Sequence, residues 1–515
     1  MALLTSVMAI ENGFAAEAGS EWGPIEGDAV RRVGVVDVGS NSVRLVVFDG
    51  VARSPAYFYN EKILCGLGVA LQETGLLNAD GRTRALAAIR RFAALARVMQ
   101  VTALTGVATA AVREADDGLE FCRVVQAETG LRLHVASGAE EAVLSAKGVL
   151  LGWPQATGLV CDIGGASMEL ARVVEGEIAE RGTSPLGPLR LANLGSVKEI
   201  EKKIAREIKV LLDTVGNSAR RVFLVGGSWR AIARLDMERR SYPLKVLHEY
   251  RMSVGDLTET CDWLADANPA DLKSLTDTSS ARLELVPLAA RVLRGLAKAL
   301  APDSLSVSSY GLREGLLYER MPASLRARDP LLEAARHMEQ SRARFPGFGA
   351  SLYTWLMPLY PDVERVELRL IRAACYLHDI TWRAHPDYRA EVCFETVTRA
   401  NLSGLDHIGR VFLGAAILNR YKNSQSGLDP EVLGLLSEAE LHRAETLGRA
   451  IRLGAMLSGA APGSLEDTQL QVKAGTLSLT LRGDARALRG EAVERRLNAL
   501  AGRLDLQSEV RLAAS

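Results

Sequence analysis

The stretch VGVVDVGSNSVRLVVF, residues 33–48, decides the fold, because a near copy, GLVCDIGGASMELARV, occurs at residues 158–173. The copies lie 125 residues apart and share the frame D-x-G-x-x-S-x-x-L. In each, an apolar run leads into a short Gly/Ser turn and a second apolar run follows, which is typical of strand, tight turn and strand. The repetition predicts two half-domains of one design.

The residue types in both turns suit a phosphate-rich anion. Glycine lets backbone amides approach an anion, serine adds a hydroxyl donor, and aspartate can hold a hydrated divalent cation. We therefore expect the two half-domains to grip one polyanion between them. The alternative is a pair of ordinary hairpins with polar tips.

The length and the order of the patterns predict several domains around a duplicated α/β core. A chain of 515 residues exceeds one hydrophobic core, so three or four domains are expected. Strand patterns fill residues 33–65, and a helical pattern follows over 80–100, with Asp80 as a candidate N-cap. The expected parts are a disordered leader (1–30), a first lobe (31–152), a second lobe (153–302), a helical domain (325–445) and a small α+β domain (446–515). Residues 303–320 are a candidate for returning to the first lobe.

The composition excludes a strong global charge. Lys+Arg and Asp+Glu each total 62, so no overall field favours nucleic acid or a membrane surface, and attraction for a polyanion must be local. Six cysteines show neither a CxxC pair nor metal-ligand spacing, which favours a reduced cytoplasm. No apolar run has the length of a membrane helix, and the first thirty residues lack the basic start of a signal peptide.

Glu141 is the candidate catalytic base. Ser137 and Glu140 have the spacing of a capping box, which gives Glu140 a structural role. Glu141 lies about 100° further round the helix and has no capping partner. The alternative is a solvated carboxylate that favours the helix dipole. Hydrolysis of a phosphoanhydride needs a base to orient and deprotonate water, and a carboxylate can do this.

Asp162 and Glu169 are candidate metal ligands. They stand seven residues apart, so both can face the same end of one hairpin and hold Mg²⁺ together with phosphate oxygens. Asp37 is the matching aspartate of the first copy, whereas the position that matches Glu169 is Arg44, which makes the duplicated site asymmetric. The alternative for Glu169 is a surface glutamate.

Cationic groups and a third glycine turn complete the candidate site. Arg113 follows a predicted strand and is placed to pair with phosphate oxygens. Arg190 and a lysine-rich helix near 197–214 could track a longer anion, although a solvated surface is the favoured interpretation of that helix. Gly226, Gly227 and Ser228 end a strand, open a helix and join the phosphate-binding candidates.

The helical segment carries His378 followed by Asp379, with His337 and His407 elsewhere in the same region. A histidine and aspartate of this kind resemble the metal-binding core of helical phosphohydrolases. The flanking residues do not supply further ligands in a clear order, so a packed helical module without activity is favoured over a metal site.

These motifs together resemble the exopolyphosphatase / guanosine pentaphosphate phosphohydrolase family. The stretches that carry the resemblance are VGVVDVGSNSVRLVVFDG, ATAAVREA, SGAEEAVLSAKG, GLVCDIGGASMEL, VGGSWRA and VSSYGLREGLLYE, over about residues 31–320. The resemblance implies a two-lobed core of the actin, sugar kinase and Hsp70 superfamily (ribonuclease H-like), an all-α HD-like domain after 329, and a small terminal domain. It also suggests a homodimer.

The resemblance implies a role for each matching residue. Glu141 is the base that activates water, Asp162 and Glu169 are associated with Mg²⁺, and Arg113 binds phosphate. The phosphate loops are Gly39, Ser40, Asn41, Ser42, Gly164, Gly165 and Ser167. Many members carry a third glycine where this chain has Ala166, a departure that can change the preference for chain length.

The resulting interpretation is a cytoplasmic exopolyphosphatase that removes terminal orthophosphate from inorganic polyphosphate with Mg²⁺; a monovalent cation is a further candidate. The nearest alternative is hydrolysis of guanosine pentaphosphate. A kinase of the same superfold and a non-catalytic polyphosphate sensor are weaker alternatives, because Glu141 suits water and the carboxylates are intact.

Overall fold

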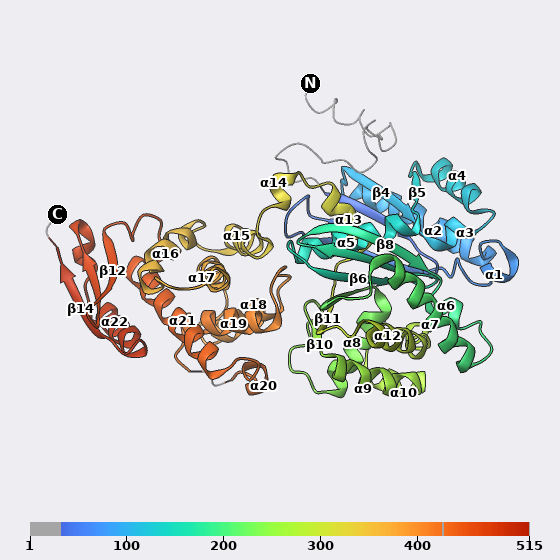
Figure 1. Cartoon of the computed structure of the whole chain (residues 1–515). Coiled ribbons are helices and arrows are strands. Elements are labelled where there is room, and N and C mark those ends of the chain that lie inside the picture. Colours follow the sequence, from blue (N-terminus) through green and yellow to red (C-terminus); the bar gives the residue numbers. More distant parts are fainter. Residues whose placement is uncertain (1–31, 425–426, 514–515) are drawn as a thin grey trace, which may run out of the picture. The chain divides into compact units, whose positions relative to one another are not determined.

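The computed structural model describes residues 32–424 and 427–513, and the expected leader lies outside them. The chain divides into two compact units, one ending at Arg328 and the other beginning at Asp329. Figure 1 shows the sheets of the first unit in blue and green and the helices of the second in yellow to red.

The first lobe is built on a five-stranded sheet. Its order is β3-β2-β1-β4-β5, with β3, β2 and β1 antiparallel and β1, β4 and β5 parallel. The strands are β1 (Val33–Val38), β2 (Ser42–Phe48), β3 (Tyr57–Leu64), β4 (Ala103–Ala108) and β5 (Leu133–Val135). The helices of this lobe are α1 (Leu71–Thr74), α2 (Ala79–Val98), α3 (Ala110–Glu114) and α4 (Gly118–Thr129), followed by α5 (Gly138–Gly152).

The second lobe repeats this topology. Its sheet has the order β10-β11-β9-β6-β7-β8, so β8-β7-β6-β9-β11 corresponds to β3-β2-β1-β4-β5. The predicted duplication is therefore confirmed. The strands are β6 (Gly158–Ile163), β7 (Met168–Val174), β8 (Glu177–Ser184), β9 (Arg221–Val225), β10 (Arg251–Met252) and β11 (Ser304–Val307). The helices are α6 (Pro188–Leu191), α7 (Val197–Val215), α8 (Gly227–Arg239), α9 (Val254–Ala265), α10 (Pro269–Leu272), α11 (Ser280–Leu283) and α12 (Val286–Leu300).

One expected helix start was wrong. Helix α2 is capped by Asn78, whose side chain accepts a hydrogen bond from the backbone amide of Gly81. Asp80 lies inside the first turn, where its negative charge favours the helix dipole. An asparagine two residues earlier offers the same kind of cap, and it takes that position.

Helix α5 lies between the two sheets and packs on both. Leu144 and Leu151 join a core with strands of the first lobe, while Ala142 and Ala146 join a core with strands of the second. This double packing is possible because α5 is apolar over most of its surface. The N-terminal end of α5, with Glu141, is therefore fixed relative to both lobes.

Helix α13 (Leu312–Glu319) joins the same core as α5, so residues 303–320 are divided between the lobes. Strand β11 belongs to the second sheet, whereas α13 packs with strands of the first. A Cβ added at Gly315 would lie 1.8 Å from the carbonyl oxygen of Leu144, and one at Gly148 would lie 2.2 Å from that of Gly311. Glycine thus lets the two helices touch at their backbones. The short helix α14 (Ala323–Arg326) follows.

The C-terminal unit begins with helices and ends with a small sheet. The helices are α15 (Pro330–Arg342), α16 (Phe348–Leu356), α17 (Arg365–Leu377), α18 (Arg389–Arg399), α19 (His407–Tyr421), α20 (Pro430–Leu433), α21 (Glu438–Ser458) and α22 (Glu491–Arg503). The strands are β12 (Thr468–Lys473), β13 (Thr476–Leu481) and β14 (Gln507–Leu512), in the order β12-β13-β14. The expected boundary at residues 445 and 446 falls inside α21, so we propose that the terminal α+β part begins after this helix.

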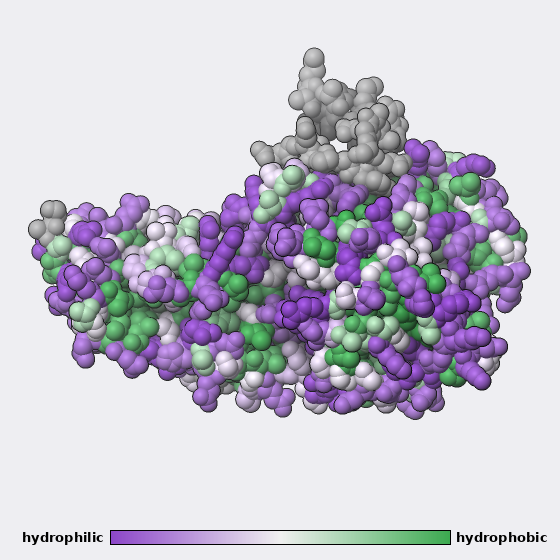
Figure 2. Space-filling view, in the orientation of Figure 1, coloured by the Kyte–Doolittle hydropathy of each residue, from purple (hydrophilic) through white to green (hydrophobic). Residues whose placement is uncertain are grey.

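The surface shown in Figure 2 is mainly hydrophilic, as the balanced charge and apolar content of the sequence predict. On the face shown in Figure 2, hydrophilic residues dominate and smaller hydrophobic patches are interspersed among them. Scattered apolar side chains are ordinary on a protein surface. Among residues 32–424 and 427–513, every helix is too short or too polar to cross a lipid bilayer.

Candidate functional site

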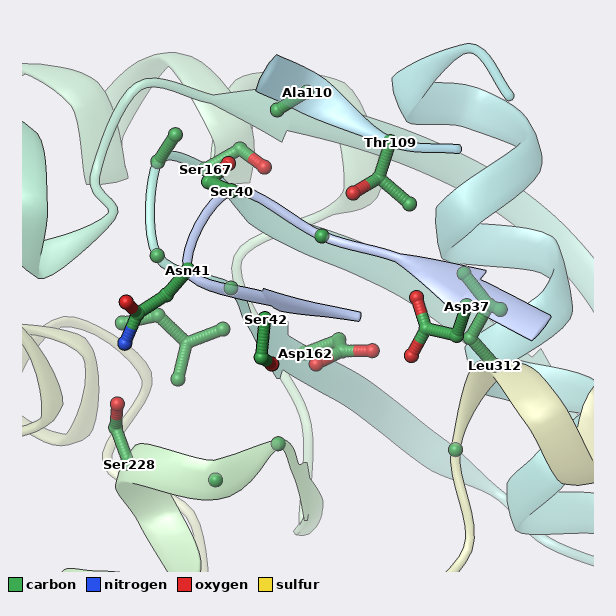
Figure 3. Close-up of a pocket in the computed structure, with 18 of the residues that line it drawn as sticks. Asp37, Ser40, Asn41, Ser42, Thr109, Ala110, Asp162, Ser167, Ser228 and Leu312 are labelled. Carbon is green, nitrogen blue, oxygen red and sulfur yellow. The ribbon is translucent and has the colours of Figure 1, made fainter. Parts of the chain in front are cut away.

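The two duplicated turns have the same local structure. The backbone amide of Gly39 donates to the carbonyl of Ser42 over 3.0 Å, and the amide of Gly164 donates to the carbonyl of Ser167 over 3.0 Å. A Cβ added at Gly165 would lie 3.7 Å from the Cβ of Ser40, so the turns approach each other at their tips. Figure 3 shows Ser40 and Ser167 at this meeting point and the carboxylates of Asp37 and Asp162 directed toward one another. The expected convergence of the two copies is present.

Both turns line one cavity of about 230 Å³ in the N-terminal unit. Of the residues assigned to catalysis, to phosphate or to the metal ion, all except Arg113 lie on its wall. They are Asp37, Gly39, Ser40, Asn41, Ser42, Glu141, Asp162, Gly164, Gly165, Ser167, Glu169, Gly226, Gly227 and Ser228. Strands far apart in the sequence thus place their turns at one opening.

Asp162 and Glu169 face each other across the β6–β7 ladder, and Asp37 faces Arg44 at the matching position of β1 and β2. One hairpin therefore presents two acids and the other an acid and a base. Burial raises the pKa of Asp162, and burial together with the charges of Glu141 and Asp162 raises the pKa of Glu169 well above its usual range. The carboxylates repel one another in a poorly solvated space.

Glu140 has the capping role that its spacing predicted, whereas Glu141 lies on the wall of the cavity. The Ser137 hydroxyl accepts from the amide of Glu140, and the Glu140 carboxylate accepts from the amide of Ser137, which completes the capping box. Glu141 is only 9% exposed and lines the cavity. Desolvation raises its pKa to about 7, although the neighbouring Arg113 acts in the opposite direction. A carboxyl with this pKa can accept a proton near neutral pH.

Arg113 is placed differently from the other candidates. Its guanidinium donates to the Glu141 carboxylate and, over 2.6 Å, to the backbone carbonyl of Ala136. It is absent from the residues that line the cavity. In this structure Arg113 therefore holds the candidate base.

Five basic side chains lie on the cavity wall, and the sequence analysis named only Arg44 among them. They are Arg44, Lys62, Arg230, Arg282 and Arg313. Desolvation, reinforced by the nearby arginines, lowers the pKa of Lys62 to about 8, and desolvation and repulsion from Arg313 lower that of Arg230 to about 10. Cations that destabilise one another in this way favour a polyanionic ligand.

Some of these basic residues were within reach of the sequence. Arg230 and Arg313 stand inside quoted motifs, Arg230 two residues after the glycine turn at 226–228 and Arg313 inside YGLREG. Arg313 also pairs with Asp37 over 3.0 Å. Arg282 and Lys62 belong to no motif, and only the packing of α11 and β3 brings them to the cavity.

Gly226 lets the third turn approach Asp162 closely. Its φ of 113° is a conformation that other residues rarely adopt, and an added Cβ would lie 2.9 Å from Oδ1 of Asp162. Because Gly226 has no side chain, Oδ1 of Asp162 lies against the backbone of the third turn.

The candidate metal ligands on the cavity wall are the carboxylates of Asp162 and Glu169. Within the described residues, no group of three His, Cys, Asp or Glu side chains is arranged to hold a metal ion. Mg²⁺ commonly takes only one or two carboxylates and completes its shell with water and phosphate oxygens. Asp162 and Glu169, neighbours with raised pKa values, fit such a cation, which would relieve their repulsion.

Arg190 and the basic residues of α7, which could track a longer anion, are absent from the cavity wall. Arg190 pairs with Glu114 at the end of α3. On α7, Lys209 pairs with Asp213, and Lys198 and Lys202 are exposed. This agrees with the favoured interpretation of α7 as a solvated face.

In the C-terminal unit, the His378–Asp379 pair is buried. Both oxygens of Asp379 accept from the Arg344 guanidinium, over 2.7 and 2.9 Å. The His378 Nδ1 lies 2.9 Å from the carbonyl of Cys375, and burial, the largest cause, lowers the pKa of the imidazole to about 4. An arginine thus supplies the positive charge beside Asp379, which is consistent with the packed-module interpretation.

Comparison with known proteins places these features in a family. The sequence model of the Ppx/GppA phosphatase family matches residues 46–324, and that of the exopolyphosphatase C-terminal region matches residues 331–508. Exopolyphosphatase 1 of Mycobacterium leprae is 27% identical over 305 residues, which cover 56% of this chain and 89% of that protein. Exopolyphosphatase 2 of Mycobacterium tuberculosis is 26% identical over 313 residues, which cover 56% of this chain and 98% of that protein. The crystal structure of an exopolyphosphatase from Cytophaga hutchinsonii has the same fold, with a TM-score of 0.51 and 23% identity, covering 56% of this chain and 97% of that chain.

Proposed function

Because the chain belongs to the Ppx/GppA phosphatase family, we propose that it is an exopolyphosphatase, which releases terminal orthophosphate from inorganic polyphosphate. The observation that carries the proposal is that two phosphate-type turns and the Glu141 carboxylate line one cavity. Family membership also implies that the activity depends on a divalent cation, and we propose Mg²⁺.

The terminal phosphates bind between the turns. Backbone amides and hydroxyls of residues 40–42 and 165–167 donate to the phosphate oxygens, as fixed dipoles that need no reorganisation. The basic wall of Arg44, Lys62 and Arg282 neutralises the rest of the chain of phosphates. This accounts for a polyanionic substrate in a protein without net charge.

The chemical step is attack by water on the terminal phosphorus. Glu141 accepts a proton from the water molecule while the water oxygen forms a bond to the terminal phosphorus. The bond between this phosphorus and the bridging oxygen breaks. The electron pair stays on that oxygen, at the end of the shortened chain. A Mg²⁺ ion held by Asp162 and Glu169, with Asp37 nearby, would supply positive charge for the leaving phosphates.

The cavity has the features that a hydrolase requires, since the base lies beside the phosphate turns. Hydrolysis of guanosine pentaphosphate would use the same groups and is the nearest competitor. A kinase would transfer phosphate to an added acceptor, and a sensor would bind polyphosphate without turnover.

The proposed assembly follows from the resemblance, and the proposed compartment follows from the cysteines. We propose a homodimer in the cytoplasm, with Mg²⁺ and a monovalent cation as candidate activators. The six cysteines are free, which agrees with a reducing compartment. Light scattering on the purified protein tests the dimer, and assays with K⁺ or Na⁺ test the monovalent cation.

Phosphate-release assays with long-chain polyphosphate and with guanosine pentaphosphate, each with and without Mg²⁺, test the function. We expect Mg²⁺-dependent release of orthophosphate from polyphosphate at the higher kcat/KM. A higher kcat/KM for guanosine pentaphosphate would favour that competitor, and binding of polyphosphate without release would favour a sensor.

A further inference from the structure

Two hydroxyl groups hold the carboxylates that the proposed function assigns to the metal ion. Ser145 of α5 donates to Oδ2 of Asp162, and Thr183 of β8 donates to Oε1 of Glu169 over 3.0 Å, beside a further hydrogen bond to Glu169 from Ser167 of the second turn. Within the described residues, no ion pair joins Asp162 or Glu169 to a lysine or arginine. In the described part of the chain, hydrogen bonds from hydroxyl groups, and not ion pairs, therefore hold these two carboxylates.

Ser145 lies at an uncommon place for a serine. It is fully buried, and α5 is otherwise apolar around it, with Ala142 and Ala146 as neighbours. A buried hydroxyl costs free energy unless it is hydrogen-bonded, and serine is a weaker helix former than alanine. Alanine would be more stable at this position, so the serine indicates that its hydrogen bond to Asp162 serves the site.

The bond leaves one oxygen of Asp162 available to the cavity. Oδ2 is engaged by Ser145, while Oδ1 lies beside Gly226, where a Cβ would be only 2.9 Å away. The rotation of the carboxylate is thus limited on both sides. Asp162 lines the cavity, and we infer that Oδ1 is the oxygen that it presents there.

Thr183 acts in the same way on Glu169. The two residues are direct partners across the β7–β8 ladder, so their side chains stand on the same face of the sheet. The methyl group of Thr183 also fills the space beside Gly138, the first residue of α5, where an added Cβ would lie 2.6 Å away. Thr183 is thereby fixed against the helix that carries Glu141.

Ser145 and Glu141 are four residues apart on α5, which places them on one face, a turn apart. The helix therefore carries both the candidate base and the hydroxyl that holds Asp162. We propose that Ser145 and Thr183 are positioning residues, which fix Asp162 and Glu169 for a divalent cation and hold that cation in register with Glu141. This inference rests on the proposed function of the same site.

Hydrogen-bond partners of metal ligands typically change metal affinity about 10–100-fold when they are removed. We therefore expect Ser145→Ala and Thr183→Val to weaken Mn²⁺ binding by about tenfold, measured by electron paramagnetic resonance titration of the free protein. The Mg²⁺ concentration for half-maximal activity should rise by a similar factor, while kcat at saturating Mg²⁺ changes less. Thr183→Ser keeps the hydroxyl and should restore wild-type Mn²⁺ affinity.

Ser458→Ala is the matched control, because it removes another buried helical hydroxyl, which donates to the carbonyl of Gly454 in the C-terminal unit. It should leave Mn²⁺ affinity unchanged. Wild-type affinity in both Ser145→Ala and Thr183→Val would overturn the inference and leave the proposed function standing. Failure of the wild-type protein to bind Mn²⁺ would instead remove the metal role of Asp162 and Glu169, and the inference with it.

Discussion

The Arg113 guanidinium donates a hydrogen bond to the carboxylate of Glu141, and the same group donates to the carbonyl of Ala136. The proposed base is therefore held by a cation at the edge of a cavity that already contains other carboxylates. The pair links the ionisation of Glu141 to a residue that does not line the cavity.

The acid side of the pH–activity profile tests this link. Burial raises the pKa of Glu141 to about 7, and a base works only when it is ionised, so kcat/KM should fall tenfold per pH unit well below that pKa. Arg113 lowers this pKa, so Arg113→Gln should shift the acid limb of the kcat/KM profile to higher pH by roughly one unit. A bound cation would also lower the pKa of Glu141 and shift the acid limb to lower pH. All profiles are therefore compared at one saturating Mg²⁺ concentration.

Arg113→Lys is the control, since it keeps a positive charge beside Glu141. Its limb should stay close to that of the wild type, although the two-point hydrogen bonding of the guanidinium is lost. An unchanged limb in Arg113→Gln would show that Arg113 does not set the ionisation of Glu141.

Lys62 provides a prediction about substrate binding. Desolvation and the neighbouring arginines lower its pKa to about 8. Its charge is lost as the pH rises through 8, so the KM for polyphosphate should rise above that pH. Lys62→Met should raise KM about tenfold at pH 7 and flatten the rise, with kcat little changed. Lys202→Met, on the exposed face of α7, should match the wild type in steady-state assays.

Gly315 provides a prediction about stability. An added Cβ would lie 1.8 Å from the carbonyl oxygen of Leu144, so Gly315→Ala must separate α13 from α5. We expect a loss of about 1–3 kcal/mol in the free energy of unfolding, measured by urea denaturation, and reduced activity because α5 carries Glu141. Gly502 of α22 has open space around its Cβ position, so Gly502→Ala should stabilise the protein by up to about 1 kcal/mol. Equal stability of the two variants would contradict the described packing.

His378 makes the C-terminal unit sensitive to acid. Its pKa falls from 6.5 in the unfolded chain to about 4 in the buried site, so the unfolded state binds more protons between these values. Stability should therefore decrease as the pH falls through 6.5 toward 4, by roughly 3 kcal/mol at the lower limit. His378→Gln should remove this part of the pH dependence in thermal denaturation, whereas His385→Gln, at an exposed position, should retain it. An unchanged slope in His378→Gln would contradict the burial of a neutral imidazole.

The duplicated turns were predictable because their structure is local. The bond from Gly39 to Ser42 and its copy from Gly164 to Ser167 span three residues, and the strand patterns on either side set the register. Glu140 and Glu141 could be separated for the same reason, since a capping box has a fixed spacing. Repetition then indicated that both turns serve one site.

The remaining features depend on packing between distant segments. Nothing near Arg113 in the sequence indicates that it turns to Glu141, and Arg282 reaches the cavity only through the fold of the second lobe. The division of residues 303–320 between β11 and α13 follows from glycine contacts with α5. At the start of α2, two residues could both cap the helix, and local pattern alone did not choose Asn78.

The Glu141→Gln variant tests the central claim most directly, through orthophosphate release and polyphosphate binding measured on the same preparation. Loss of the base should reduce release by about 10²–10⁴-fold, while binding of polyphosphate stays within a few-fold of wild type. Glu140→Gln, one residue away, keeps the capping box and should retain wild-type release. Release by Glu141→Gln at the wild-type rate would contradict the account.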